Sequence, residues 1–596
     1  MYDVVICGGG LAGLSLARQL KMTMPELSVL ILEKTSGEVP VSPYKVGESL
    51  DETSNFYLSN ILQLESYLQE HQLHKLGLRW FFGGGNLPLE TRPEIGPPEF
   101  PSIRARHVDR KALENHLVQL NKESGVAHFT GVLVKDILLS EDDSPHEVLY
   151  TQQGGNHFTV KCRWLVDATG RRRYLQSKLN LTQPSGHRAN AVWWQLEGKH
   201  SLDKMADDAD WLSRNNHQRW FSTNHLMGDG YWVWVIPLIT GNTSIGIVAA
   251  EEMHPLSKHS NYQSAMKWLE EHEPHFAKFI QTSTAQNFLA VKDFCYHSQQ
   301  VFSEKRWSCV GDSAIFTDPF YSPGVVMLAY SNCLTVKMIE LDHQNQLTAE
   351  IVQQFNNLLL RDIGHNYLQI YQDNYPVFGS FNVMSIKLFW DAVYIWFFPG
   401  ALFFQQHFTN LEVLSNFSRI AQRYLALNQR VQKLFQDWGQ AIKSQNFPCF
   451  LAYDISYKPT CLGKPRANGK RFFFDIFKEA HFSLVEKKDT QQYLADLEVQ
   501  MQELEIWAQV IFRHALNQVM PERLSQFPEP FWVNVWAIGL NPEKWEEDRL
   551  FQPETEPQVD LRNYILAELP DDHYPPGAEP VTTSSVDNPA YVAAVN

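Results

Sequence analysis

The feature that most constrains this chain is a glycine-rich turn, GGGLAG, at residues 8–13. The apolar run YDVVIC at 2–7 predicts a strand before it, and residues 14–22 predict a helix after it. A second apolar strand, SVLILE, occupies 28–33 and ends on Glu33, twenty residues after the last glycine. Strand, glycine turn, helix and strand in this order predict an α/β domain with a doubly wound, Rossmann-like sheet.

Each glycine of the pattern G-x-G-x-x-G has a physical role. Gly8 permits the tight turn, Gly10 lets the backbone approach a pyrophosphate, and Gly13 allows the helix to pack closely on the sheet. Glu33 is expected to accept hydrogen bonds from ribose hydroxyls, while the helix N-terminus faces the phosphates. The turn therefore predicts a bound dinucleotide, NAD or FAD, and the neighbouring residues assigned to it are Leu11, Ala12 and Lys34.

Composition sets the broad class. The chain has 596 residues, 44% hydrophobic and 20% charged, as is ordinary for a globular protein of several domains. A net charge of −16 argues against a nucleic-acid partner, which would need a basic face. The seven cysteines form no CxxC pattern, so neither a metal site nor a disulfide framework is predicted. Met1 leads into a strand without a signal-peptide pattern, so we expect a cytoplasmic protein.

The order of strand-like, helix-like and acidic, proline-rich stretches predicts five segments. Residues 1–187 are the first part of the dinucleotide-binding domain, and 301–345 return to the same strand–turn–helix texture as its second part. Between them, the Trp-rich, strand-like residues 188–300 predict an inserted β-sheet substrate domain. Residues 346–552 predict a mostly helical C-terminal region that lines a substrate chamber, and the acidic, proline-rich residues 553–596 predict a tail.

One helical stretch, IKLFWDAVYIWFFPGALFF at 386–404, is long and apolar enough to span a membrane. It carries Lys387 and Asp391 and is interrupted by a Pro–Gly pair, so we interpret it as a buried helix and expect no stable membrane span. Aromatic side chains three to four residues apart predict one stripe over the substrate chamber. The residues of that stripe are Phe389, Trp390, Tyr394 and Phe397.

Three further segments favour FAD over NAD. The first is the glycine–acid turn VGES at 46–49, and the second is DATGR at 167–171, which closes a strand. The third starts with GDSA at 311–314 and runs to a helix beginning near Gly324, whose positive end would face the flavin. No His or Cys in the glycine turn or the third segment offers a covalent tether, so we expect non-covalent binding. The residues assigned to FAD here are Val46, Gly47, Glu48, Ser49, Arg110, Asp167, Gly311, Asp312, Pro319, Gly324 and Val325.

Two more motifs resemble those of the flavin-dependent halogenases. WVWVIP at 232–237 matches the signature W-x-W-x-I-P of that family, and Lys75, in HKLGLRWFF, falls where the family carries its catalytic lysine. The resemblance covers roughly residues 1–345. The signature residues, which the resemblance places along an internal tunnel, are Trp232, Trp234, Ile236 and Pro237.

The resemblance also implies a reaction and its partners. Reduced FAD (FADH2), supplied by a separate NAD(P)H-dependent flavin reductase, would react with O2 and a halide ion to give hypohalous acid. The tunnel would lead this acid to Lys75, which holds it by hydrogen bonding or forms a haloamine. An electron-rich aromatic substrate, phenolic or tethered to a carrier protein, would then be halogenated. Halide would bind at Ser322 and Gly324.

Three positions depart from the family pattern. Tyr321 replaces the glutamate that tryptophan halogenases carry before the serine, which argues against free tryptophan as the substrate. Pro323 has no N–H and removes one backbone donor expected to hold halide. The residues after the GES turn are Asp51, Glu52 and Thr53, where many relatives have Leu-Pro.

Other functions therefore stay open. A flavin monooxygenase, oxidative decarboxylase or other oxidoreductase of the same fold would use no halide, and Pro323 is its best support. A reductase of isoprenoid chains rests on the shared fold and on the apolar helix at 386–404. A non-enzymatic flavin-binding scaffold would leave Lys75 and the signature tryptophans without a reason to occur together.

Overall fold

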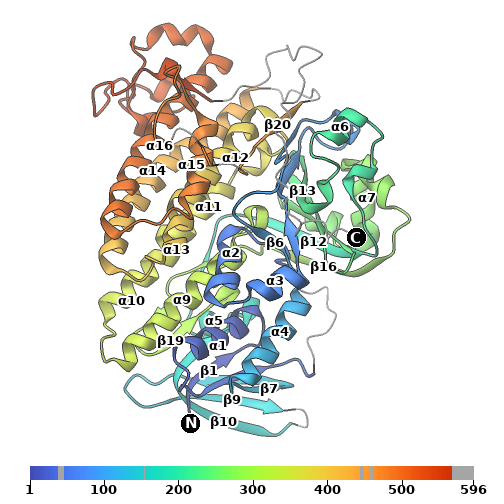
Figure 1. Cartoon of the computed structure of the whole chain (residues 1–596), viewed down its shortest axis with the longest axis vertical. Coiled ribbons are helices and arrows are strands. Elements are labelled where there is room, and N and C mark those ends of the chain that lie inside the picture. The colour runs from blue at the N-terminus through green and yellow to red at the C-terminus, as the bar shows by residue number, and fades with distance from the viewer. Residues whose placement is uncertain (38–45, 153–154, 443–448, 457, 460–461, 567–596) are drawn as a thin grey trace.

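Two eight-stranded β-sheets, three small two-stranded sheets and a helical region make up the described part of the molecule (Figure 1). The computed structural model describes the chain except for residues 38–45, 153–154, 443–448, 457, 460–461 and 567–596. Residues 567–596 of the predicted tail therefore lie outside the described residues.

The first sheet is the predicted doubly wound sheet. Its parallel core has the order β19 (Trp307–Cys309), β10 (His157–Asp167), β1 (Tyr2–Cys7), β2 (Val29–Glu33) and β7 (Ala127–Thr130). Helix α1 (Leu11–Thr23) follows β1 and packs against α4 (Arg110–Glu123) and α9 (Gly324–His343). The apolar side chains of β1 are fully buried, as expected for a strand covered on both faces. Strand β19 joins the sheet from after residue 300, so strands from both sides of residues 188–300 share this sheet.

The second sheet has eight strands and lies beside the first. It is mainly antiparallel, with helix α7 (Tyr262–His272) and helix α8 (Pro274–Ile280) in the same segment. Three of its strands come from outside residues 188–300. Two of them lie near residues 77–96 and one near residue 451, and together they extend one edge of the sheet. Its strand order is β16 (Ala285–Lys292), β12 (Ala189–Leu196), β15 (Thr243–Ala250), β14 (Tyr231–Pro237), β13 (Ser222–Gly228), β4 (Gly77–Phe81), β5 (Glu94–Gly96) and β20 (Phe450–Ala452).

The C-terminal region is mostly helical and stands along one side of both sheets in Figure 1. Its main helices are α12 (Phe381–Ile395), α14 (Leu411–Ala441), α15 (Phe473–Ser483) and α16 (Thr490–Val519). Helix α14 packs along α16, and α12 packs against α15. The chain is therefore a mixed α/β protein with a helical C-terminal region.

Within the described part of the chain, two helical runs are long and apolar enough to cross a membrane, Gly324–His343 and Phe381–Phe404. In their most apolar windows 78% and 89% of the residues are buried inside the protein. Within the second run, Lys387 Nζ pairs with Asp391 Oδ2 at 2.7 Å, and both side chains are fully buried. Core helices of a folded protein have this burial, in agreement with the interpretation of 386–404 as a buried helix.

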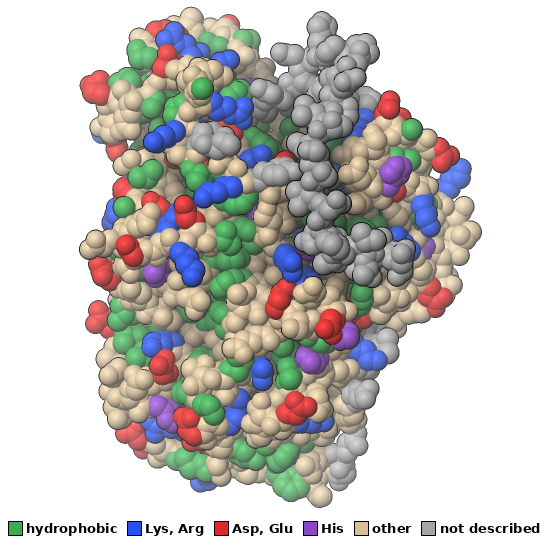
Figure 2. All heavy atoms as spheres, viewed as in Figure 1, with side chains coloured by type: hydrophobic (Ala, Val, Ile, Leu, Met, Phe, Trp, Pro, Cys, Tyr) green, Lys and Arg blue, Asp and Glu red, His purple; other side chains and the backbone are tan. Residues whose placement is uncertain are grey.

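On the face seen in Figure 2, acidic, basic and hydrophobic side chains are interspersed over the described residues. Such a mixed face gives no continuous basic surface of the kind that a nucleic acid would need.

Candidate active site

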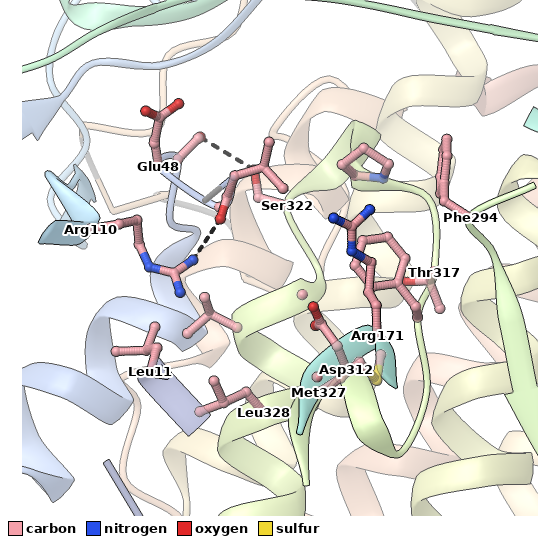
Figure 3. A pocket seen from close by; sticks show the side chains of 18 of the residues that line it. Leu11, Glu48, Arg110, Arg171, Phe294, Asp312, Thr317, Ser322, Met327 and Leu328 are labelled. Atoms are coloured by element: carbon pink, nitrogen blue, oxygen red, sulfur yellow. Dashed lines mark hydrogen bonds between the residues drawn. The ribbon is translucent and has the colours of Figure 1, made fainter. Parts of the chain in front are cut away.

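A cavity of about 280 Å³ lies where the first sheet, the second sheet and α9 meet. The N-termini of α1 and α9 both line it, through Leu11 and Gly324. Helix N-termini carry unpaired N–H groups and partial positive charge, which suits phosphate and the electron-rich edge of a flavin. Figure 3 shows side chains that line the cavity, including Arg110 on one side and Arg171 on the other.

The glycine turn has the geometry that its spacing predicts. Gly8 has a φ of +122°, and a Cβ there would lie 2.2 Å from the Ala168 carbonyl oxygen. A Cβ on Gly13 would lie 2.1 Å from the Gly8 oxygen, so α1 can approach the sheet only with glycine there. Gly10 has open space beyond it and lines the cavity. The turn therefore leaves room for a ligand at Gly10 and nowhere else along these three positions.

Glu33 and Asp167, the two acidic residues assigned to the cofactor from the sequence, accept hydrogen bonds from backbone N–H groups of the protein. Glu33 accepts from the N–H groups of Gly9 and Thr35, at 2.7 and 2.8 Å. Asp167 is fully buried and accepts from Thr169 and from the Leu175 N–H. The described lining of the cavity includes neither acid, because each carboxylate is turned into its own loop. The other assigned residues that this lining does not include are Gly8, Gly13, Lys34, Gly311 and Pro237.

The remaining assigned residues converge on the cavity. Glu48 accepts from Gln195 Nε2 at 3.1 Å, and burial raises the pKa of Glu48 to about 7. Arg110 donates to the Val46 carbonyl at 2.6 Å and to Glu114 at 3.0 Å, which fixes the VGES turn against α4. The assigned residues in the lining are Gly10, Leu11, Ala12, Val46, Gly47, Glu48, Ser49, Arg110, Asp312, Pro319, Ser322, Gly324 and Val325.

The cavity also contains residues that the sequence did not single out. Trp193, Val291 and Phe294 come from the inserted segment, and Phe316 and Thr317 come from the connection to α9. No motif marks them, because they are brought in by the way the second sheet stacks on the first. Apolar and aromatic walls, two helix N-termini and the open Gly10 together fit a dinucleotide that carries a large flat ring.

A second, smaller cavity of about 70 Å³ surrounds Lys75. Lys75 ends β3 (Leu73–Lys75) and is 2% exposed. Its Nζ donates to Ser49 Oγ and to the Leu50 carbonyl, both at 2.9 Å. Burial lowers the pKa of Lys75 to about 8, against the attraction of Glu52 and Asp51, which favours the ammonium. Lys75 is therefore a buried amine that can exchange a proton near neutral pH.

The two cavities meet at a pair of serines. Ser322 Oγ donates to Ser49 Oγ at 3.2 Å, and Ser49 also bonds Thr223 Oγ1 at 2.8 Å. Both serines line the first cavity, Ser49 is the acceptor for Lys75, and Tyr321 lines the second cavity. A short distance across hydroxyl groups thus separates the first cavity from the lysine.

The signature tryptophans lie on the first cavity only. Trp232, Trp234 and Ile236 alternate along β14 and line the first cavity, whereas the described lining of the second does not include them. In place of the expected single tunnel from the flavin to Lys75, the described residues form two separate cavities. Alternation along a strand explains why the three side chains share one face.

The aromatic helix lines the second cavity with a different face from the predicted one. Phe389 lines it, together with Ala392 and Trp396. Trp390 instead donates to Asn428 Oδ1 at 2.9 Å, and the ring of Tyr394 stacks on Tyr424 with centroids 4.1 Å apart. The described lining of the second cavity does not include Phe397 either. The predicted stripe was wrong for Trp390, Tyr394 and Phe397, because this helix is buried on nearly every side and its period cannot select the face that lines the cavity.

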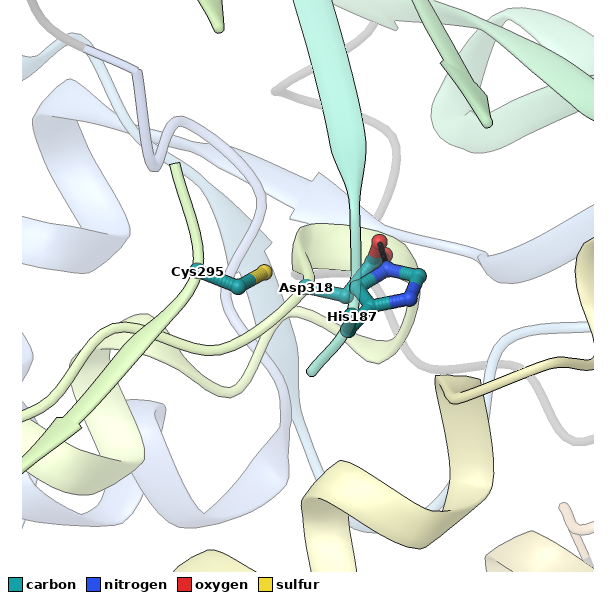
Figure 4. Close-up of side chains that lie close together, drawn as sticks. All are labelled: His187, Cys295 and Asp318. Carbon is teal, nitrogen blue, oxygen red and sulfur yellow. Dashed lines mark hydrogen bonds and ion pairs between the residues drawn. The ribbon is translucent and has the colours of Figure 1, made fainter. Parts of the chain in front are cut away.

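A hydrogen-bonded cluster supports the segment between the cavities (Figure 4). Asp318 accepts from His187 Nε2 at 3.0 Å, from Tyr375 Oη at 2.5 Å and from the Phe320 N–H at 3.0 Å. With Cys295, these side chains place three metal-ligand types within 4.8 Å of one another. Because the Asp318 carboxylate already has three donors, we interpret the cluster as a support that positions residues 318–322.

Fold and first cavity define an FAD-dependent enzyme of the oxidoreductase type. The chain belongs to the FAD binding domain family, which matches residues 1–314. It is 28% identical over 430 residues to the flavin-dependent halogenase chlA of Dictyostelium discoideum, covering 66% of this chain and 69% of that protein. The match to the flavin-dependent halogenase armH1 of Armillaria mellea is 27% over 348 residues, covering 54% of this chain and 62%, under two thirds, of the relative.

Two further comparisons extend this similarity. The 1H-pyrrole-2-carbonyl-[peptidyl-carrier protein] chlorinase of Pseudomonas fluorescens is 23% identical over 389 residues, covering 61% of this chain and 82% of that protein. The crystal structure of halogenase PltM in complex with phloroglucinol and FAD has a TM-score of 0.61 at 18% identity, covering 74% of this chain and 93% of PltM. At that identity the structural match shows the fold alone.

Proposed function

We propose that this chain is a halogenase that uses FADH2, O2 and a halide ion to halogenate an electron-rich aromatic substrate. The observation that carries the proposal is the position of Lys75, buried in its own cavity and one serine away from the FAD cavity. An ordinary surface lysine would be solvated, whereas this amine has lost its water and has a pKa of about 8. Such a lysine suits the capture of a small electrophile.

The residues that would hold FAD are those of the first cavity. The Gly10 turn and the N-terminus of α1 would take the pyrophosphate, and the N-terminus of α9 would face the ring. Bound and reduced, FAD supplies with O2 the oxidising equivalent that converts halide into hypohalous acid. Trp232 and Trp234 close the wall of this cavity, which supports the exclusion of an organic substrate from it.

Halide binding is assigned to the start of α9. Ser322 and Gly324 line the first cavity, and so does Val325. Pro323 offers no N–H, but the first N–H groups of a helix have no acceptor within the helix. Gly324 and Val325 can therefore present two neighbouring donors to an anion beside the serine.

The partner and the substrate class follow from the same two cavities. A separate NAD(P)H-dependent flavin reductase would supply FADH2, because no second dinucleotide fingerprint follows the first. The second cavity is walled by Trp80, Phe389, Trp396 and Phe477, which suits an aromatic ring. We propose a phenolic substrate, free or on a carrier protein. A cytoplasmic location stays a prediction.

The competing function is a flavin monooxygenase or oxidative decarboxylase that uses no halide, favoured by Pro323. The experiment that separates the two is product mass from the full chain with FAD, NADH, a flavin reductase, bromide and a panel of phenols. The proposed function predicts the bromine isotope pattern in the product and no organic oxygenation. An oxygenated product that forms equally well without bromide would establish the competing function.

A further inference from the structure

Two carboxylates share the second cavity with Lys75. Asp51 and Glu52 begin helix α2 (Glu52–Phe56) and both line the cavity, while Leu50, Thr53 and Ser54 around them are buried. Asp51 caps the helix by accepting from the Ser54 N–H at 2.8 Å. The part of each carboxylate that stays accessible is therefore available to whatever occupies the cavity.

Glu52 is held in place as an anion. His481 Nε2, on the fully buried His481 of α15, lies 3.7 Å from Glu52 Oε1, and Trp396 Nε1 donates to Oε2 at 3.4 Å. Burial alone would raise the pKa of Glu52, but His481 and Lys75 hold it below its ordinary value. Glu52 is thus the fixed counter-ion of the lysine.

Asp51 differs from its neighbour. Burial raises the pKa of Asp51 to about 7, and the negative charge of Glu52 adds to that rise. A carboxylate with a pKa in this range can take up a proton at neutral pH, which is the property of a general base.

Tyr321 stands where tryptophan halogenases carry a glutamate, and it cannot act as an acidic residue toward the second cavity. Tyr321 donates to Asp391 Oδ2 at 2.9 Å, and Asp391 is in turn bound by Lys387 at 2.7 Å and by Gln432 at 2.8 Å. Among the described residues that line the second cavity, Asp51 and Glu52 supply the carboxylates. The third sequence departure therefore places acids beside Lys75 from a different segment of the chain.

We infer that Asp51 is a catalytic residue that accepts the hydroxyl proton of a phenol bound in the second cavity, an inference that rests on the proposed function. The cavity of about 70 Å³ is roughly half the size of a cavity that admits benzene, so the lining side chains must shift to take an aromatic ring. Trp80 and Phe389 would cover the ring, and the hydroxyl group would point to Asp51. The substrate class is thus a hydroxyarene rather than an indole or an unsubstituted arene.

The step balances with hypohalous acid as the oxidant. A ring carbon attacks the halogen, the C–X bond forms, and the O–X bond breaks with its electron pair on oxygen. The departing hydroxide takes a proton from the Lys75 ammonium and becomes water, while Asp51 takes the phenolic proton and a neutral dienone results. The dienone loses its ring C–H proton to the Lys75 amine and regains the hydroxyl proton from Asp51. Ammonium, carboxylate and aromatic ring are restored.

The first test measures binding and needs no turnover. Titration calorimetry of the full chain with oxidised FAD would compare 4-methylphenol with its methyl ether, 4-methylanisole. The wild type should bind the phenol about tenfold more tightly or better, because a charged acceptor meets its O–H. In Asp51→Asn this preference should fall to about twofold or less. An unchanged preference in the variant, or none in the wild type, would overturn the inference.

The second test follows turnover with bromide across phenols of increasing acidity. Asp51→Asn should lose about 100-fold or more in kcat with 4-methylphenol, the range of general-base catalysis, and much less with 2,3,5,6-tetrafluorophenol, which is already ionised at neutral pH and keeps one ring C–H. Loss of the same factor for every phenol would contradict the base role. Trapped hypobromous acid is measured in parallel. If the wild type forms none, the proposed function is wrong, and the binding test alone then decides whether Asp51 contacts the phenol hydroxyl group.

The variant and its control are matched. Asparagine is a good N-cap, so Asp51→Asn keeps an acceptor for the Ser54 N–H. Asp208 caps α6 (Ala209–Ser213) in the same way, accepting from the Trp211 N–H at 2.8 Å, on a helix outside both cavities. Asp208→Asn should leave the phenol preference and the turnover as in the wild type.

Discussion

The two cavities are built in different ways. The first is built around backbone features, namely a glycine turn, two helix N-termini and short loops that end parallel strands, and apolar side chains of the second sheet complete its wall. The second is made of side chains from distant segments of the sequence, among them Asp51, Lys75, Phe389 and Phe477. Backbone sites need particular residues at fixed spacings, so they leave motifs, whereas side-chain sites depend on tertiary packing. The first cavity could therefore be predicted from motifs, whereas the second, apart from Lys75, could not.

The largest expected effect tests the backbone character of the first cavity. Gly10→Val should abolish FAD binding, because its side chain would occupy the space into which the pyrophosphate fits. Nothing lies within 4 Å of a Cβ at Gly10, so the FAD-free variant should keep the melting temperature of the FAD-free wild type. Gly13→Ala is the contrast, since its Cβ would lie 2.1 Å from the Gly8 oxygen and should lower the melting temperature itself. Calorimetric FAD titration and thermal melts measure both, and FAD binding by Gly10→Val at wild-type affinity would contradict the assignment.

The next effect should be confined to the second cavity. Lys75→Met keeps the length of the side chain but removes the amine, so halogenated product should fall 100-fold or more. FAD affinity and the rate of FADH2 oxidation should stay within about twofold, since Lys75 lines only the second cavity. Mass-spectrometric product assay and stopped-flow absorbance separate the two quantities. A variant with wild-type product yield would make Lys75 a structural residue.

The pH dependence of turnover should report the second cavity alone. With Asp51 as base and the Lys75 ammonium as proton donor, kcat should rise through pH about 7 and fall through pH about 8. Other titratable groups near this pair include Glu52, His481, Tyr321, Tyr453, Tyr367, His107 and His225. Asp51→Asn should remove the acidic limb and keep the alkaline limb. A rise of kcat through pH 8 would instead indicate a haloamine, which needs the neutral amine.

The smallest expected effect concerns stability at the first cavity. Burial raises the pKa of Glu48 from its ordinary value of 4.5 to about 7. Its contribution to the free energy of unfolding is therefore fully present below pH 4.5 and is lost as the pH rises through 7. Glu48→Gln stays neutral, so the FAD-free variant should be about 1–3 kcal/mol more stable than the wild type at pH 8, with a much smaller difference at pH 4.5. Denaturant unfolding at the two pH values measures this, and an equal difference at both would refute it.

The sequence could predict what backbone geometry imposes. The glycine turn and the presence of two sheets follow from local patterns, although three strands of the second sheet come from outside residues 188–300. Glu33 shows the limit, because an acid at the end of a strand can hold a ligand or its own loop, and only tertiary structure decides. In the same way, DATGR marks the correct loop, but the cavity is lined by Arg171 and not by Asp167.

The second cavity could be predicted only at Lys75, where a family resemblance supplied the position. Asp51 and Glu52 were visible as a departure, yet nothing in a linear sequence places them beside a lysine more than twenty residues away. The aromatic helix was predicted to line the chamber, which Phe389 does. Its contacting face could not be chosen, because a helix buried on all sides has no polar face to mark its opposite.

The pair of serines between the cavities has a consequence for selectivity. Ser49 lines the first cavity and accepts from Lys75, so under the proposed function a single hydroxyl group, itself hydrogen-bonded to Ser322, separates the oxidant from the lysine. A barrier of that size discriminates by bulk: a two-heavy-atom oxidant is close in size to the groups it must pass, while any aromatic ring is far larger. Under the proposed function, this partition would act as a size filter that only the smaller reagent crosses.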